Sequence, residues 1–306
     1  MSNGSQHAAY AIEEVTYAVT PTTPTMFAIR HTDFDLGMDK DTLQSAEIRA
    51  DRNVSDLRLG QNKCGGSFGM EVLNDLGFEN FMAAVFGNAW STGTLVNGLT
   101  RKSFSILRHF GDLDSGNKPY HLLTGVEFGS CDLKIPTGGI ATVSFDTIAK
   151  TYVPGATAPA SSTLSAPTTT GPMDSFTGVV QEGGATIGVI TEANVKFDNG
   201  LDRRFVIGSK DTLRPSQKKF TVSGSISCYY ESATMLDKFL NGTDSSLSIQ
   251  LANGAETFQL DLPKVKYTGG RVSVKDDGPI VISLPFTAVY DGTTAGSAKL
   301  TRNPTT

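Results

Sequence analysis

The sequence predicts a mainly β protein built from two tandem β-barrel or β-sandwich units, each covered by one packed α-helix. Three observations lead to this fold class: short alternating runs between turn residues, a low-complexity stretch near the midpoint, and a similar order of motifs on either side of that stretch. Alternation of apolar and polar residues, as in residues 140–145 and 280–284, is typical of half-buried antiparallel strands.

Composition supports a folded chain of two domains. The 306 residues are 39% hydrophobic and 19% charged, which is ordinary for a globular protein. The net charge of −5 provides no global basic field for binding nucleic acid. The three cysteines are odd in number and lack metal-ligand spacing, so we expect unpaired thiols from a reducing cytoplasm. The sequence has neither a standard secretion signal nor an apolar stretch of membrane-spanning length, so no membrane association is expected.

The domain division follows from the low-complexity stretch. Residues 153–170 read VPGATAPASSTLSAPTTT, with no charge and almost no large apolar side chain. Such a composition buries too little surface to offset its ordering entropy. We therefore expect a first unit at residues 1–152, a Pro/Ala/Ser/Thr-rich linker or loop at 153–172, and a second unit at 173–306.

Motifs recur in the same order in the two halves, which indicates an internal repeat. FDLG at residues 34–37 is matched by FDNG at 197–200, and the Gly-Ser pair at 66–67 by the pair at 224–225. Near the end of each half, residues 126–150 align without gaps on 265–289, at a constant offset of 139 (265 − 126).

Each half also carries one amphipathic helix pattern. In the first, Asn74 or Asp75 can cap a helix that ends at Gly87; in the second, Ser232 can cap a helix that ends at Gly242. The apolar residues recur at the spacing of one helical face. They are Phe78, Phe81, Met82, Val85 and Phe86 in the first half, and Met235, Leu236, Phe239 and Leu240 in the second.

A search for chemistry predicts no catalytic residue, no metal site and no cofactor. The sequence around Ser67, GGSFG, fits the G-x-S-x-G nucleophile pattern, but the residues after Ser67 continue as a strand where that pattern needs a helix. An acidic cluster departs from calcium-loop spacing and is interpreted as a solvated turn. The histidines are scattered, so we expect surface or strand positions. These residues are Asp33, Asp35, Asp39 and Asp41, and His7, His31, His109 and His121.

The most distinctive segment covers residues 45–60, SAEIRADRNVSDLRLG. Its charges alternate in sign, with three acids and three bases, and apolar residues lie between them. One interpretation is an ordinary solvated hairpin. The other is an arm that docks on a neighbouring copy, since alternating charges can fix a register. The charged residues are Glu47, Arg49, Asp51, Arg52, Asp56 and Arg58.

This segment, followed by the Gly-Ser strand and a helix ending in FGNAW, resembles the tail tube proteins of long-tailed, siphophage-type bacteriophages. The resemblance implies a structural subunit, not an enzyme, located in the virion tail and assembled in the host cytoplasm. It implies rings that stack into a tube, with other tail proteins at the tube ends and a lumen that conducts DNA without specific binding. Single-unit subunits of the family form hexamers, so a duplicated subunit needs only three copies.

The corresponding connection in the second half, residues 201–218, has an excess of basic residues and is expected to meet a different partner from the first arm. Together with the charged residues of segment 45–60, its bases are the expected contacts between rings or subunits. They are Arg203, Arg204, Lys210 and Arg214.

Two other functions stay open from the sequence. The first is a virion adhesin or carbohydrate-binding β-sandwich, which would remain a discrete oligomer and bind glycans. The second is an esterase that uses Ser67.

Overall fold

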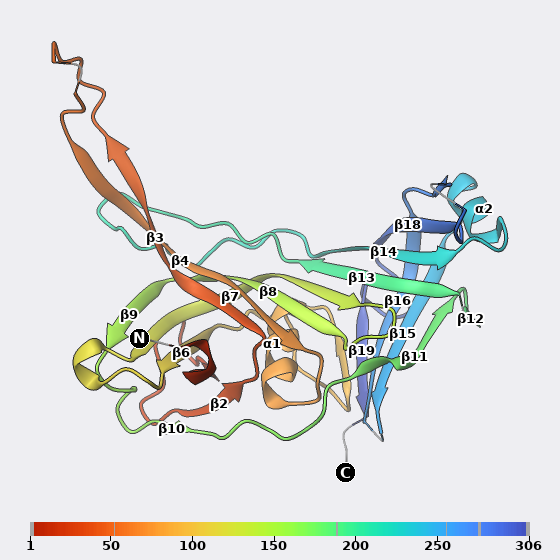
Figure 1. The fold of residues 1–306 in the computed structure, drawn as a ribbon, viewed down its shortest axis with the longest axis horizontal. Helices are drawn as coiled ribbons and strands as arrows, with labels where there is room; N and C mark the ends of the chain where they lie inside the picture. Colours follow the sequence, from red (N-terminus) through yellow and green to blue (C-terminus); the bar gives the residue numbers. More distant parts are fainter. Residues whose placement is uncertain (1–2, 52, 188, 255, 275–276, 304–306) are drawn as a thin grey trace.

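The computed structural model describes residues 3–303 except 52, 188, 255 and 275–276. The chain is mainly β, as expected (Figure 1). What we call the first half, residues 3–155, contains two short 3-10 turns, one helix and nine strands. These are η1 Gly4–Gln6, β1 His7–Glu13, β2 Thr25–Ile29, β3 Asp33–Gln44, β4 Leu57–Glu71, α1 Leu76–Phe86, β5 Thr94–Val96, β6 Phe104–Phe110, η2 Ser115–Asn117, β7 Tyr120–Ile135, β8 Thr142–Ala149 and β9 Thr151–Gly155.

The second half, residues 174–303, follows a connecting segment that holds the short strand β10, Thr163–Leu164. Its elements are β11 Asp174–Glu182, β12 Ala185–Thr186, β13 Ile190–Asp198, β14 Thr221–Tyr229, α2 Thr234–Leu240, β15 Ser245–Asn253, β16 Glu256–Tyr267, β17 Arg271–Ser273, β18 Val281–Ala288 and β19 Lys299–Asn303.

Hydrogen-bonded strands have the same order in both halves. The first half runs β1-β6-β7-β8-β4-β3, and the second runs β11-β15-β16-β18-β14-β13, with every pair antiparallel. Inward-facing side chains of each half form the core. In the first half it is dominated by packed aromatic rings, and the most deeply buried of these are Phe68, Phe81, Phe104 and Phe145.

Helix α1 forms and ends where the sequence predicts. The Asp75 side chain accepts a hydrogen bond from the backbone N–H of Phe78 at 2.7 Å, which satisfies one of the donors that a helix start leaves free. At the other end Gly87 has φ 62°, a left-handed conformation that glycine adopts without a Cβ penalty. The helix packs against β7 and buries its apolar face in the first core.

Helix α2 differs from the prediction at its start. It is seven residues long, and its first flanking residue is Ala233, whose side chain makes no capping bond. The Ser232 hydroxyl is 3.5 Å from the backbone N of Thr234, a marginal contact at an exposed position. Ser232 therefore does not act as the expected cap. The helix still turns its partly buried apolar residues, Met235, Leu236 and Phe239, toward the second core.

The strand registers agree with the alignment at offset 139. In the first half Phe128 pairs with Thr147, and in the second Tyr267 pairs with Phe286, which is the same pair shifted by 139. A β-bulge also interrupts the pairing of β6 with β7 and that of β15 with β16. It lies between residues 104 and 106 of β6 and between residues 245 and 247 of β15. A bulge is a specific local feature, so its recurrence at the corresponding place extends the agreement.

The two FDxG motifs do not occupy equivalent positions in the structure. Leu36 pairs with Gly66 in β3 and β4, whereas Val195 pairs with Gly224 in β13 and β14. Leu36 therefore corresponds to Val195, at an offset of 159 (195 − 36), and not to residue 199 as the motif suggested. A four-residue motif is too short to fix a register by itself, and the match of FDLG with FDNG was wrong.

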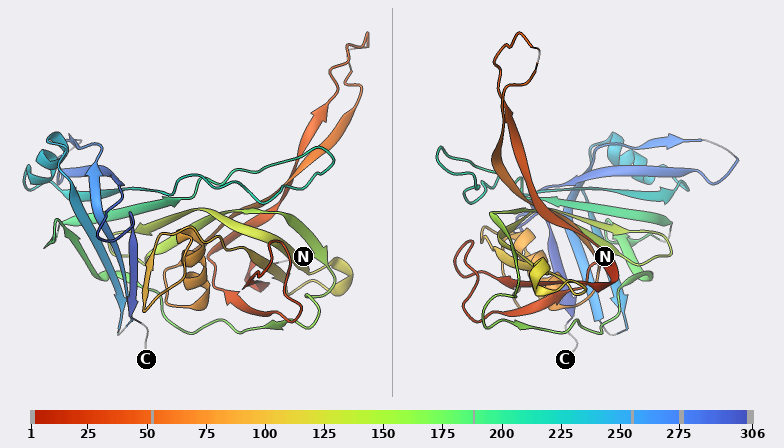
Figure 2. Two further views of the ribbon diagram at one scale, coloured as in Figure 1. Left: turned by 180° about the vertical axis from the view of Figure 1, so that it is seen from behind. Right: turned by 60° about the vertical axis from the view of Figure 1, so that its left-hand side comes forward.

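One strand joins the two halves. The first part of β7 pairs with β6, and its last part, residues 130–135, pairs with β13 on the same edge. The C-terminal strand β19 adds a second junction by pairing with β5 of the first half. Figure 2 shows the two strand layers meeting along this junction, with β3 and β4 continuing far beyond the body as a hairpin arm.

The low-complexity stretch has more structure than a free linker. Its first residues continue β9, and β10 pairs in parallel with β2 of the first half. The backbone N–H of Ser165 also donates to the carbonyl of Met26 at 2.9 Å. The stretch thus crosses the surface of the first half before it reaches β11 (Figure 1).

Candidate functional site

The hairpin arm formed by the outer parts of β3 and β4 and the loop between them projects from the body (Figure 1), and the carbonyl of Leu59 on it accepts a hydrogen bond from Lys210. Its described charged residues are exposed, and two ion pairs lie within it, Arg49 with Asp51 at 2.8 Å and Arg58 with Asp56 at 2.7 Å. Glu47 is also exposed, and Arg52 lies outside the described residues. The arm therefore presents charges of both signs to solvent.

Apolar side chains on the same arm are exposed as well. Ile48 is 98% exposed, and Val54, Leu57 and Leu59 each expose more than half of their surface. Exposed apolar side chains gathered in this way are typical of surfaces that bind other proteins.

The connection from β13 to β14, residues 199–220, lies against the first half of its own chain. The backbone N–H of Asn62 donates to the carbonyl of Lys210 at 2.9 Å, and the Lys210 ammonium donates to the carbonyl of Leu59 at 3.2 Å. Arg203 donates to the carbonyl of Cys64 at 2.9 Å. Arg204 donates to a carbonyl of the connection itself.

Arg214 joins a buried ion-pair cluster at the junction of the halves. Its guanidinium donates to Glu127 of β7 at 2.7 Å, and Arg101 pairs with the other carboxylate oxygen. The Glu127 side chain is only 4% exposed, and two cations compensate the cost of burying its charge. Arg214 also lies over the ring of Tyr17, 5.1 Å from its centroid. The four basic residues expected to make contacts between rings or subunits thus bind groups within one chain.

The structure gathers histidines that the sequence suggested were scattered. His7 lies in β1 and His31 follows β2, yet their Nδ1 and Nε2 atoms are 2.9 Å apart. Arg108 of β6 donates to His7 Nε2 at 3.2 Å, so His7 must accept there and donate through Nδ1 to His31. His31 in turn donates to the carbonyl of Ile29 at 3.1 Å. This network requires both rings to be neutral.

The surroundings favour that neutral state. Burial, with the Arg108 charge as the second cause, lowers the pKa of His7 to about 4. Burial also lowers the pKa of His109 and of His121, which lie in β6 and β7 nearby. His7, His109 and His121 lie in strands, one of the two positions expected, but their proximity was not predicted, because strands distant in sequence are neighbours in the first half. Only the sheet topology could have revealed the cluster.

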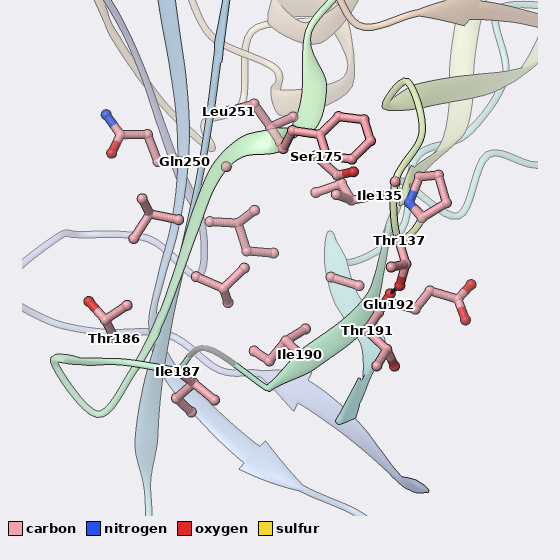
Figure 3. A pocket seen from close by; sticks show the side chains of 18 residues that line it. Ile135, Thr137, Ser175, Thr186, Ile187, Ile190, Thr191, Glu192, Gln250 and Leu251 are labelled. Carbon is pink, nitrogen blue, oxygen red and sulfur yellow. Dashed lines mark hydrogen bonds between the residues drawn. The ribbon is translucent and has the colours of Figure 1, made fainter. Parts of the chain in front are cut away.

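The corresponding place in the second half is a cavity of about 350 Å³ between β11, β13 and β15 (Figure 3). By the strand registers, Ile249 in the second half occupies the position of Arg108 in the first, and Ala193 occupies the position of Phe34. Phe34 is the ring that contacts His7 and His31. In the first half a cation and aromatic rings fill this space. In the second half, the aliphatic Ile249 and Ala193 stand in place of Arg108 and Phe34, and Figure 3 shows Leu251 also lining the cavity.

The geometry around Ser67 lacks the setting of a nucleophile elbow. Ser67 lies inside β4, which continues to Glu71 before α1 begins, so no helix follows the serine directly. Asp33, Asp35 and Asp39 are spread along β3, and Asp41 pairs with Lys63 at 2.6 Å. Among the described residues no group of three His, Cys, Asp or Glu side chains is arranged to hold a metal ion.

Cys64, Cys131 and Cys228 are unpaired and buried, as predicted. Within the described ranges, neither helix is long and apolar enough to cross a membrane.

Comparison with known proteins gives one result. A search of curated proteins found no match. A family model described as phage tail tube protein matches residues 4–288, which covers most of both halves, the arm and the connection between β13 and β14. The chain therefore belongs to the phage tail tube protein family and is a structural subunit of a tail tube.

Proposed function

We propose that the chain assembles with copies of itself into rings, and that these rings stack into a tube whose lumen conducts DNA from the capsid to the host cell. The observation that carries the proposal is the repeated strand order and register of the two halves, which meet edge to edge through β7 and β13. One chain then already contains two neighbouring units of a ring.

The ring should contain three chains. If each half is one duplicated tail tube unit, three chains supply six units (3 × 2), the number that single-unit hexamers provide. The alternative is a ring of six chains. When each unit binds the next through two unlike surfaces, a ring forms only if the rotation that relates neighbouring units closes on itself. The junction between the two halves fixes this rotation once within every chain.

The arm should make the contacts between successive rings. The arm projects beyond the body (Figure 2), and its apolar and charged side chains are exposed, which suits a surface buried only in the assembly. Arg203, Lys210 and Arg214 already bind groups of the first half, so we assign to them the bracing of the two halves, and Arg204 binds within the connection itself.

DNA should pass through the lumen without specific binding. A ring of three chains would carry a net charge of −15 (3 × −5), which repels phosphates of like sign. Assembly would take place in the host cytoplasm, with other tail proteins at the two ends of the tube.

Electron microscopy of the purified protein at increasing concentration tests this proposal, combined with light scattering for particle mass. Rings of three chains and stacked tubes are expected. A chain that remains monomeric at every concentration and salt condition would contradict it.

A further inference from the structure

We propose that the cavity between β11, β13 and β15 is a binding site for a small, flat, neutral aromatic molecule. This inference goes beyond the proposed ring and does not depend on it, because the cavity lies within one chain. The chemical class of the ligand follows from the volume of the cavity, from its lining, and from the groups that fill the same place in the first half.

The first observation is the volume. The cavity holds about 350 Å³, which lies within the range of ~300–1,000 Å³ typical of pockets that bind small molecules. A dry apolar cavity of only about 150 Å³ in a protein core is already large enough to bind benzene. The space between these strands can therefore hold a molecule larger than a single ring.

The second observation is that the cavity is bounded by aliphatic side chains from both halves. Among the described residues that line it, Glu192 alone carries a charge, and Figure 3 shows this side chain pointing away from the space. Moving a charged group into such surroundings without a partner costs free energy, so the ligand should be neutral. The aliphatic lining residues include Ile135, Val180, Ile190, Ala193, Ile249 and Leu251.

The third observation is what fills the corresponding place in the first half. The centroid of the His7 ring lies 5.4 Å from that of Phe34 and 5.1 Å from that of Phe110. The Arg108 guanidinium lies over both phenyl rings, 5.5 Å and 5.1 Å from their centroids. Flat groups packed against one another therefore occupy this space in the first half.

The second half has aliphatic side chains, or none, at the matching positions. All four of these residues line the cavity, which is thus the space that the flat groups of the first half would fill. A flat molecule of similar shape is therefore the ligand that fits. By strand register, the replacements are Gly178 for His7, Ala193 for Phe34, Ile249 for Arg108 and Leu251 for Phe110.

The cavity opens to solvent beside Phe176. This side chain lines the cavity and is 77% exposed. A Cβ added at Gly138 would lie 3.5 Å from the ring of Phe176, so the ring stands at the rim, over the turn that follows β7. An aromatic ring at the entrance offers a face or an edge against which the ring of a ligand can pack.

A ligand in this cavity would contact both halves of the chain. Ile135 ends β7 of the first half and lies opposite Ala193 of β13 in the second. A ligand that binds the folded chain and not the unfolded one stabilises it, increasingly so as the ligand concentration rises. We therefore expect the melting temperature to increase with ligand concentration.

Indole is the probe, because it is flat and neutral. Indole-3-acetate is the matched control ligand, because it has the same ring system with a carboxylate added. Calorimetric titration of the full, unassembled chain should show binding of indole, and binding of indole-3-acetate weaker by about tenfold or more, since its carboxylate would lose water without gaining a partner. Equal affinities for the two molecules would overturn the proposal, as would neither heat nor a rise in melting temperature with indole up to its solubility.

Refilling the cavity tests where indole binds. Ala193→Phe installs the ring that Phe34 supplies in the first half, and should weaken indole binding by about tenfold or more. Val153→Phe is the control variant, since it places the same ring at an exposed position outside the cavity and should bind indole like the wild-type chain. If Ala193→Phe does not fold, Leu251→Phe tests the same cavity. Indole binding that is as tight in the refilled variant as in the wild-type chain would contradict this site.

Titration of assembled tubes separates a small molecule from a second copy of the chain as the occupant. Indole should bind tubes as it binds the unassembled protein. Loss of indole binding on assembly would mean that a neighbouring chain covers the cavity, and would overturn its assignment to a small molecule. If the chain forms no tubes, the proposed function fails, whereas titration of the unassembled chain still tests this site.

Discussion

Glu127 is a buried carboxylate that ties the second half to the first, because Arg214 and Arg101 both bind it. Glu127→Gln removes the charge and leaves two arginines, which are partly exposed and can regain water. We expect a loss of about 1–3 kcal/mol in the free energy of unfolding, less than for a fully buried pair. Thermal melting measures it, and for a chain of this size the melting temperature should fall by several degrees.

Glu47→Gln is the matched control, since Glu47 is an exposed carboxylate on the arm. It should melt like the wild-type chain. Equal melting temperatures for both variants would mean that the Glu127 cluster does not stabilise the junction.

The His7 network makes stability depend on pH. Because the pKa of His7 in the folded protein is about 4 and that of an unfolded histidine is about 6.5, the unfolded chain binds more protons between these values. The stability that neutral His7 contributes is thus complete above pH 6.5 and is lost as the pH falls toward 4. Melting curves of wild-type protein and His7→Phe should measure this.

The quantity compared is the difference in stability between the two proteins at each pH, because the other titrating groups are common to both. The wild-type chain should lose more stability than His7→Phe between pH 6.5 and 4. Parallel pH profiles would show that His7 titrates alike in the folded and unfolded chains.

Sequence could not predict this histidine cluster. Helix caps depend on residues three or four positions apart, so the sequence predicted Asn74 or Asp75 at the start of the helix and Gly87 at its end, and the structure has Asp75 and Gly87. His7, His31 and Arg108 are brought together by strand pairing across about a hundred residues, and no local pattern encodes that.

Among the elements, the two helices differ in how they begin. Asp75 caps α1 at 2.7 Å in a buried site, whereas Ser232 makes only a marginal contact at the start of α2. We expect Asp75→Ala to reduce the free energy of unfolding by about 1–2 kcal/mol and Ser232→Ala by less than about 0.5 kcal/mol. Chemical denaturation of the two variants measures both values, and equal losses would contradict the assignment of caps.

The arm should contribute to assembly and little to the stability of the subunit. The ion pairs of Arg49 and Arg58 are exposed and lie within the arm, where solvent and salt screen them and they contribute little to stability. Arg49→Glu with Arg58→Glu should melt close to the wild-type temperature and form no tubes. Melting and filament formation would be measured on one preparation.

The charge-preserving pair Arg49→Lys and Arg58→Lys is the control and should still assemble. If the reversed variant forms tubes normally, the arm is a solvated hairpin. If it does not fold, the arm contributes to the core.

The arm was predicted from its alternating charges, and the structure has it as a long hairpin of β3 and β4. The contacts of the connection at 199–220 were not predictable, because its basic residues bind carbonyls and a carboxylate far away in sequence. A basic excess indicates that acidic or carbonyl partners exist, but it does not say whether they lie in the same chain.

For the whole molecule, the alignment of residues 126–150 on 265–289 predicted pairings that the structure has at the same offset. The junction of β7 with β13 was not predicted. An edge-to-edge contact leaves no periodic signal, since both strands keep the alternation of any half-buried strand. The sequence could therefore indicate a repeat, but not how its two copies meet.

The central claim is that one chain supplies two neighbouring units of a ring. A reconstruction of the tube by electron cryo-microscopy, at a resolution that traces strands, tests this most directly. The account predicts three chains per ring and six similar units around the axis. A ring of six chains would contradict it.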